Sequence, residues 1–302
     1  MTLESFALAT RPNIGGELRT KMRAAEMASL VSDALLTHSS IDARHLFPGA
    51  GLCLAEARLH PTVMVDRSLL DTTSNELQRI ENFPRIREVL GQLLGGWPAG
   101  LAEVLRILPV SLGELHAGPG TGLLCTATGR VGPHVNWGVS GQGFLTAGHV
   151  APISGSVVSD MGGALLGTVL WSNDPASAPS TIGEVDVALV EFGGTLTATT
   201  GRTPVIVGAG QAVSVASTGN QADVFGFFSY VRFGSAQACY SECYATDTRI
   251  TVSGDSGGLV EAGGDVVGMV IGGFTGRDMT MVQAISYQLS EIRRLSGYVV
   301  SL

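Results

Sequence analysis

The chemistry that this sequence can support centres on a serine within residues 251–258, which read Thr-Val-Ser-Gly-Asp-Ser-Gly-Gly. Ser256 lies between Asp255 and two glycines, and this composition predicts a tight turn. Glycines adopt backbone angles that other residues resist, and they let a second backbone approach closely. A serine hydroxyl becomes a nucleophile only where a base can take its proton, so the rest of the chain must supply that base.

His149 is the candidate base. It follows an apolar segment, residues 143–146, and the two small residues Ala147 and Gly148. This pattern predicts a histidine at the end of a strand. From there the ring can exchange a proton with both a nucleophile and a leaving group.

Asp186 is the candidate acid, whose role would be to orient the histidine ring. It precedes the apolar run of residues 187–190. A carboxylate that enters an apolar strand is costly unless it is paired, so Asp186 should have a partner. A solvated aspartate at a strand end is the alternative reading.

Together these segments resemble the trypsin/chymotrypsin-like serine peptidases. Residues 145–149 are similar to the family's Thr-Ala-Ala/Gly-His segment, residues 185–189 to its Asp-Ile-Ala-Leu segment, and residues 254–258 to its Gly-Asp-Ser-Gly-Gly motif. The order His, Asp, Ser is also that of the family. The resemblance covers about residues 115–302 and implies a serine endopeptidase with His149, Asp186 and Ser256 as the triad and with no cofactor or metal.

The resemblance also implies roles for the residues around the nucleophile. The backbone N–H groups of Gly254 and Ser256 would form the oxyanion hole, and Asp255 would be the structural carboxylate beside it. In family members activated by cleavage, this carboxylate pairs with a new terminal amine. Here cleavage between Arg106 and Ile107 would produce such an amine; otherwise the enzyme is built active or is switched by its first part.

Substrate recognition is predicted on the same basis. The floor of the primary pocket falls on Ile250, and the substrate-pairing strand falls on Ile271, Gly272 and Gly273. An apolar floor disfavours Arg or Lys at the cleaved position, so an apolar or medium-sized residue is expected there. The alternative is that Ile250 simply packs in the core. Because Val150 and Val252 replace two of the family's disulfide cysteines, a compact bacterial-type member is expected.

Composition narrows the class of protein. The chain has 302 residues, of which 45% are hydrophobic and 15% charged, with a net charge of −8. It is therefore globular, and its net charge argues against nucleic acid or an anionic membrane as the main partner. The resemblance implies a protein or peptide substrate. The four cysteines, Cys53, Cys125, Cys239 and Cys243, are few for a disulfide framework. With no secretory signal recognised, a cytoplasmic location is expected; Cys239 and Cys243 could still pair or bind metal.

A change in composition predicts two parts. Residues 1–110 contain 8 of the 41 glycines but 11 of the 18 Lys and Arg residues. They predict a mainly α-helical region with a regulatory, adaptor or propeptide role, containing helices over 17–36, 52–59, 74–94 and 99–108. The strand spacing of residues 111–302 predicts an all-β sandwich or barrel with a helix over 283–295. The resemblance implies the double β-barrel of the chymotrypsin-like class for this part. Strands are expected over 122–128, 135–139, 143–146, 156–158, 165–171, 185–192, 205–207, 212–216, 224–231 and 266–271.

Two other functions remain open at this point. A protease-like domain that has lost activity could serve as a binding module, although the presence of all three triad residues disfavours this. The same triad could also hydrolyse esters rather than peptides. Labelling of Ser256 by a fluorophosphonate would distinguish an active enzyme from the binding module. A substrate profile would distinguish a peptidase from an esterase.

Overall fold

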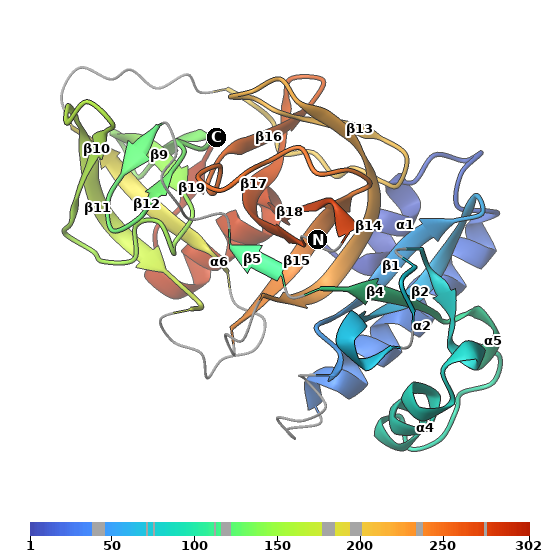
Figure 1. Cartoon of the computed structure of the whole chain (residues 1–302). Helices are drawn as coiled ribbons and strands as arrows, with labels where there is room; N and C mark the ends of the chain where they lie inside the picture. Colours follow the sequence, from blue (N-terminus) through green and yellow to red (C-terminus); the bar gives the residue numbers. More distant parts are fainter. Residues whose placement is uncertain are drawn as a thin grey trace.

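The computed structural model describes residues 1–37, 46–70, 72–74, 76–111, 113–115, 122–176, 185–193, 201–233, 238–274 and 277–302; for 113–115 only the backbone is described. Within these ranges the chain is mostly β, in two sheets, with helices before them and one near the C-terminal end (Figure 1). The predicted fold class is therefore confirmed. In the described part of the chain, no helix is long and apolar enough to cross a membrane.

The smaller sheet carries the histidine and aspartate segments. Its eight strands are antiparallel and follow the order β19-β8-β9-β12-β11-β10-β6-β7. Their bounds are β6 Leu123–Leu124, β7 Thr128–Gly129, β8 His134–Trp137, β9 Gly141–Thr146, β10 Val157–Asp160, β11 Leu165–Asn173, β12 Val187–Phe192 and β19 Val300–Ser301. Because β9 pairs directly with β12, the ends of these two strands lie close together.

The larger sheet contains a closed barrel that carries the serine segment. β13 pairs with both β16 and β14, which closes the order β13-β16-β17-β18-β15-β14 on itself. The bounds are β13 Ala212–Val215, β14 Gln221–Arg232, β15 Cys239–Thr246, β16 Leu259–Ala262, β17 Asp265–Phe274 and β18 Met279–Ala284. Helix α6, Ile285–Ser296, follows β18 directly, and its buried face includes Ile285 and Ile292.

The first 110 residues continue this larger sheet. β1 Gly49–Ala55 pairs with β14, and β2 Arg58–Asp66, β4 Arg106–Val110 and β3 Gln78–Arg79 follow outward. The helices here are α1 Leu3–Ala9, α2 Leu18–Thr37, α4 Pro84–Leu93 and α5 Leu101–Val104, with 3-10 turns η1 Arg67–Leu69 and η2 Ile80–Asn82. One sheet thus spans the predicted boundary at residue 110, and the division into two domains stays a prediction.

Several predicted elements are corrected by the structure. The helix expected over 52–59 is the hairpin of β1 and β2, which turns at Glu56 and Ala57. Both of these residues have positive φ, an uncommon conformation outside glycine that the sequence did not signal. Of the helix expected over 99–108, only α5 forms, because β4 begins at residue 106. The helix expected over 74–94, with a division at Pro84, is α-helical only from Pro84 onward, because β3 and η2 occupy residues 78–82. Proline suits the first position of α4 because it has no N–H to leave unpaired.

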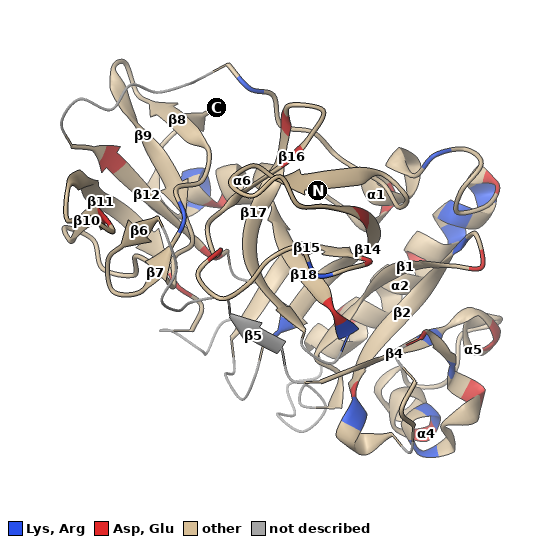
Figure 2. Cartoon of the chain, turned by 45° about the horizontal axis from the view of Figure 1, so that its top comes forward, with Lys and Arg blue, Asp and Glu red and all other residues tan. Residues whose placement is uncertain are grey.

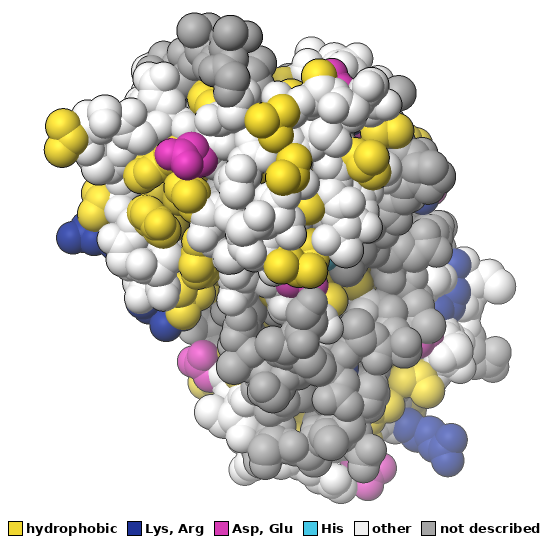
Figure 3. Space-filling model, turned by 90° about the vertical axis from the view of Figure 1, so that its left-hand side faces the viewer, with side chains coloured by type: hydrophobic (Ala, Val, Ile, Leu, Met, Phe, Trp, Pro, Cys, Tyr) yellow, Lys and Arg dark blue, Asp and Glu magenta, His cyan; other side chains and the backbone are white. Residues whose placement is uncertain are grey.

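Charged and apolar surfaces lie on different parts of the molecule. In Figure 2, Lys, Arg, Asp and Glu gather on α2, α4 and α5, whereas the two barrels carry few of them. Figure 3 shows exposed hydrophobic side chains on the smaller-sheet face. Those on and around β10 and β11 are Ile153, Val157, Met161 and Leu165. Residues 1–110 thus hold 11 of the 18 Lys and Arg residues, whereas most of the net negative charge belongs to residues 111–302, where acidic residues outnumber basic ones.

Candidate active site

His149 and Asp186 form a buried pair at one end of the smaller sheet. Asp186 directly precedes β12, and His149 follows β9, so the pairing of these strands sets the two residues side by side. Nδ1 of His149 donates to Oδ2 of Asp186 at 2.6 Å, and the backbone N–H of His149 donates to Oδ1 at 3.0 Å. Asp186 is fully buried and His149 is 9% exposed. The partner that the sequence predicted for Asp186 is therefore His149.

Gln283 and Gln288 hold the backbone of Asp186 from the other side. Gln283, on β18, accepts the Asp186 N–H through Oε1 at 2.9 Å and donates to the Ser241 carbonyl at 2.9 Å. Gln288, on α6, donates to the Asp186 carbonyl at 3.4 Å. Both glutamines are fully buried. Sequence reasoning missed them, although a glutamine in the apolar run 279–284 was a signal, since a buried amide requires partners.

The Asp186 carboxylate controls the charge of the histidine. Burial alone lowers the pKa of His149, but the negative charge and hydrogen bond of Asp186, with a smaller contribution from Asp174, prevail and raise it. Because Nδ1 is occupied by Asp186, Nε2 is the nitrogen available for proton transfer. Nε2 is buried and has no hydrogen-bond partner within the described structure. The arrangement is therefore that of an oriented base without a proton donor in place.

Ser256 lies in a pair of consecutive turns. The N–H of Asp255 donates to the Val252 carbonyl at 3.1 Å, and the N–H of Gly258 donates to the Asp255 carbonyl at 2.9 Å. The third residue of each turn is a glycine with positive φ, Gly254 at 96° and Gly257 at 82°. This is the requirement of a type II turn, and it explains the glycines on either side of Ser256.

Close packing brings the serine turn against the histidine segment. A Cβ on Gly257 would collide with Oγ1 of Thr146 and would lie 2.8 Å from the Ala147 nitrogen. A Cβ on Gly129 would lie 2.8 Å from both the Ser256 carbonyl and the Val150 side chain. The structure thus brings all three predicted triad segments together where the two sheets meet.

The serine hydroxyl itself points elsewhere. Oγ of Ser256 donates to the Ile271 carbonyl at 3.5 Å, and Ser256 is fully buried. Among the described residues, no hydrogen bond joins it to His149. Because catalytic hydrogen bonds are often long or misaligned in free enzymes and tighten with substrate, this position does not exclude nucleophilic chemistry.

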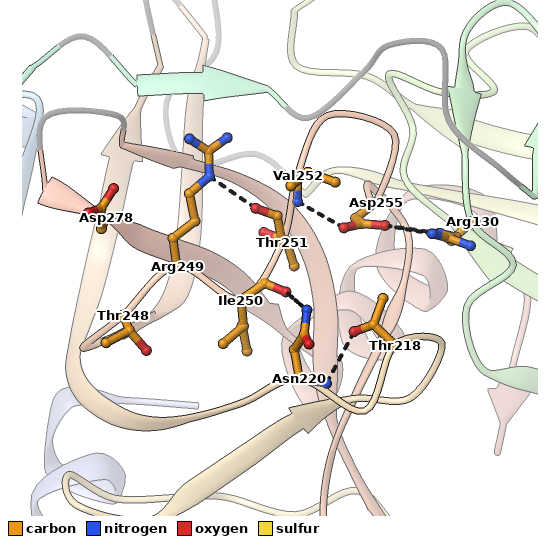
Figure 4. A pocket seen from close by; sticks show the side chains of 10 residues that line it. All are labelled: Arg130, Thr218, Asn220, Thr248, Arg249, Ile250, Thr251, Val252, Asp255 and Asp278. Atoms are coloured by element: carbon orange, nitrogen blue, oxygen red, sulfur yellow. Dashed lines mark hydrogen bonds and ion pairs between the residues drawn. The ribbon is translucent and has the colours of Figure 1, made fainter.

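Asp255 is paired with Arg130. Oδ1 of Asp255 lies 3.0 Å from both Nε and Nη2 of Arg130, and Oδ2 accepts the Val252 N–H at 2.8 Å (Figure 4). Asp255 is 2% exposed. A cleavage that frees Ile107 is not needed to supply its partner. Ile107 is fully buried within β4 between β2 and β3, so its backbone is committed to the sheet.

The residues predicted to bind substrate separate into two groups. Ile250 lines a pocket of about 440 Å³ together with Asp255, Arg130 and Arg249 (Figure 4). Ile271 is fully buried in a different apolar core, so its side chain is not a pocket wall. Its neighbours Gly272 and Gly273 pair through their backbones with β5, Gly113–Leu115. The predicted roles of Ile250 as the pocket floor and of residues 271–273 as the substrate-pairing strand stay predictions.

The cysteines stay apart from this chemistry. None of the four forms a disulfide in the structure described, and burial raises the pKa of Cys53 to about 12 and that of Cys243 well above its usual value. Within the described ranges, no cluster of three or more His, Cys, Asp or Glu side chains could hold a metal. The pairing and metal-binding alternatives for Cys239 and Cys243 therefore find no support in these residues.

Comparison with known proteins gives structural similarities. No family model and no curated protein matches the sequence. A chymotrypsin of Cellulomonas bogoriensis is 21% identical over 59% of this chain and 94% of its own, with a TM-score of 0.41. A glutamic acid specific serine protease is 20% identical over 60% of this chain and 97% of its own, with a TM-score of 0.46. Nocardiopsis protease is 21% identical over 60% of this chain and 98% of its own, with a TM-score of 0.43.

Proposed function

We propose that this chain is a serine endopeptidase that works through an acyl-enzyme. The observation that carries the proposal is the buried hydrogen bond between His149 Nδ1 and Asp186 Oδ2, at 2.6 Å, with Nε2 left without a partner. A buried carboxylate that fixes one ring nitrogen leaves the other as the base. The glycine-rich turn of Ser256 packs against the segment that carries this histidine, which supports Ser256 as the nucleophile.

In the proposed reaction, Ser256 first turns from the Ile271 carbonyl toward His149. As Oγ forms a bond to the carbonyl carbon of the peptide, its proton passes to Nε2 and the carbonyl electrons move onto oxygen. The N–H groups of Gly254 and Ser256 stabilise that oxyanion. His149 then gives its proton to the departing amine, which leaves an ester on Ser256 for water to hydrolyse by the same route in reverse.

Arg130 supports a site that is built without activating cleavage. Asp255 connects the two turns around Ser256, and its carboxylate already has a cationic partner within the chain. Charge-assisted hydrogen bonds of this kind are stronger than neutral ones, so they favour one conformation of the turn. The oxyanion donors Gly254 and Ser256 flank Asp255, and they would be held in place by the same contact.

The proposal is tested by labelling the full chain with a fluorophosphonate. The wild-type chain should gain the mass of one phosphonyl group on Ser256, and Ser256→Ala should gain none. A chain that stays unlabelled while His149 and Asp186 remain folded would favour the binding module instead. Hydrolysis of ester substrates without peptide hydrolysis would favour the esterase.

A further inference from the structure

A short strand of this chain lies on the edge that a peptide substrate would use. β5, Gly113–Leu115, pairs antiparallel with the end of β17: Leu115 is opposite Gly272, Glu114 opposite Gly273 and Gly113 opposite Phe274. The other edge of β17 is already occupied there by β18. β16 pairs with β17 only as far as Met269, so β5 takes the edge that β16 leaves open (Figure 1).

The direction of β5 is that of a strand leading toward the nucleophile. Its last residue, Leu115, is opposite Gly272, and the preceding residue of β17 is Ile271. The Ile271 carbonyl is the group to which Ser256 Oγ donates. Extended peptides are commonly recognised by addition to an exposed sheet edge, through backbone hydrogen bonds. β5 therefore makes the kind of contact that a bound peptide would make. Its C-terminal residue, Leu115, is the one paired nearest to Ile271, the residue whose carbonyl accepts the Ser256 hydroxyl.

The attachment of β5 makes it a strong competitor. β4 ends at Val110, three residues before Gly113, and every residue of β4 is buried. One end of β5 is thus tied to the larger sheet by a very short connection. Binding segments on short linkers act at effective concentrations on the order of millimolar or higher, so a free peptide must compete against that local supply.

The burial of the catalytic groups is a second and independent observation. Ser256 is fully buried, His149 is 9% exposed, and the Ser256 hydroxyl is turned to the Ile271 carbonyl rather than to the base. An endopeptidase must admit an extended chain to these groups. The structure described is therefore a closed state of the proposed site.

We infer that residues 113–115 are a built-in inhibitory strand, which occupies the substrate edge of β17 at Gly272 and Gly273 until a peptide displaces it. The inference rests on the proposed function and adds its regulation. Activity then depends on the equilibrium between paired and released β5. A partner protein or a long substrate that releases this strand would activate the enzyme without any cleavage.

The test uses the full chain and two substitutions at one position. In Glu114→Pro the backbone loses its N–H and becomes a poor ladder strand. In Glu114→Ala the side chain is shortened but the N–H remains, which makes it the matched control. Loss of the strand should lower KM for an apolar peptide substrate roughly tenfold and leave kcat nearly unchanged, because competition affects binding rather than chemistry. Glu114→Ala should keep the wild-type KM.

The outcomes separate the inference from the proposed function. Equal KM values in all three proteins, with Ser256 labelled in each, would overturn the inhibitory strand and leave the peptidase standing. No label in any of them would contradict the peptidase, and the inhibitory role would fall with it. Hydrogen exchange on folded Ser256→Ala gives a readout without turnover. An excess of an apolar hexapeptide should speed exchange in 113–115 while 272–274 stays protected, and unchanged exchange in 113–115 would refute displacement.

Discussion

Arg130 and Asp255 form an ion pair that joins the two sheets beside Ser256. Arg130 follows β7 of the smaller sheet, and Asp255 lies in the turn that precedes β16 of the larger one. The Arg130 backbone is held as well: its N–H donates to the Ser256 carbonyl at 2.8 Å, and its carbonyl accepts the Thr146 hydroxyl at 2.9 Å. Arg130 thus contacts both the serine turn and the strand that leads to His149.

Removal of the Arg130 side chain should weaken both the fold and the site. In Arg130→Met the Asp255 carboxylate stays buried and loses its cation, so the free energy of unfolding should fall by about 1.5–3 kcal/mol. Labelling of Ser256 should slow, because the turn loses its support. Urea unfolding and the labelling rate measure these effects. Arg85→Met, at an exposed position on α4, is the control, and equal losses in the two variants would contradict the role of Arg130.

Replacement of Asp186 should change both the rate and its pH dependence. A neutral His149 is needed as the base, and Asp186 raises its pKa, so wild-type activity should fall as pH drops through that raised pKa. In Asp186→Asn the raising charge is lost. The acidic limb of the pH–rate profile should therefore move to lower pH, and kcat should drop by about four orders of magnitude. An acidic limb that does not move would show that Asp186 does not act on His149.

Gln283 should act as a positioning residue. Gln283→Met keeps the length of the side chain but leaves the Asp186 N–H without its partner and removes the amide donor from the Ser241 carbonyl. The free energy of unfolding should fall by about 1–3 kcal/mol, and kcat should fall more than KM rises because the acid is misplaced. Gln92→Met, exposed on α4, is the control. If Gln283→Met lowered stability but left kcat unchanged, Gln283 would contribute to stability and not to the positioning of Asp186.

Gly148 should tolerate no side chain. A Cβ there would collide with the Asn173 carbonyl and would lie 3.1 Å from Oδ1 of Asp186. Gly148→Ala should therefore push the histidine segment from its acid and abolish most of the labelling of Ser256. Gly162→Ala is the control, since its Cβ would meet only the Asp160 side chain at 3.2 Å. Full activity in Gly148→Ala would show that this backbone can shift without cost.

The sequence predicted the residues whose chemistry constrains them most. Val187 to Val190 were recognisable as a buried strand, and Asp186 stood out because a carboxylate before such a run needs a partner. The strands around residues 143–146, 165–171 and 224–231 were also predicted correctly in type, since apolar runs between turn residues are a local signal. The three segments of the proposed triad are likewise short and local, so they could be singled out without a structure.

The missed features depend on contacts between distant residues. β1 and β2 were read as a short helix, because residues 52–59 are compatible with either state and their pairing with β14 decides between them. Arg130 could not be assigned to Asp255, because nothing in the local sequence sets its orientation. The pairing of β5 with β17 also could not be predicted, because it is a backbone contact between distant residues and leaves no side-chain pattern in the sequence.

The pairing of β1 with β14 also has a consequence for the order of events during synthesis. β1 is made early, but its partner strand emerges only after most of the chain, because Ala50 pairs with Tyr230. Such distant pairings slow folding, since the intervening loop must close before any contact is gained. β5 is also translated before the β17 edge that it covers and before Ser256. The inhibitory strand proposed for residues 113–115 is therefore already synthesised when Ser256 emerges from the ribosome.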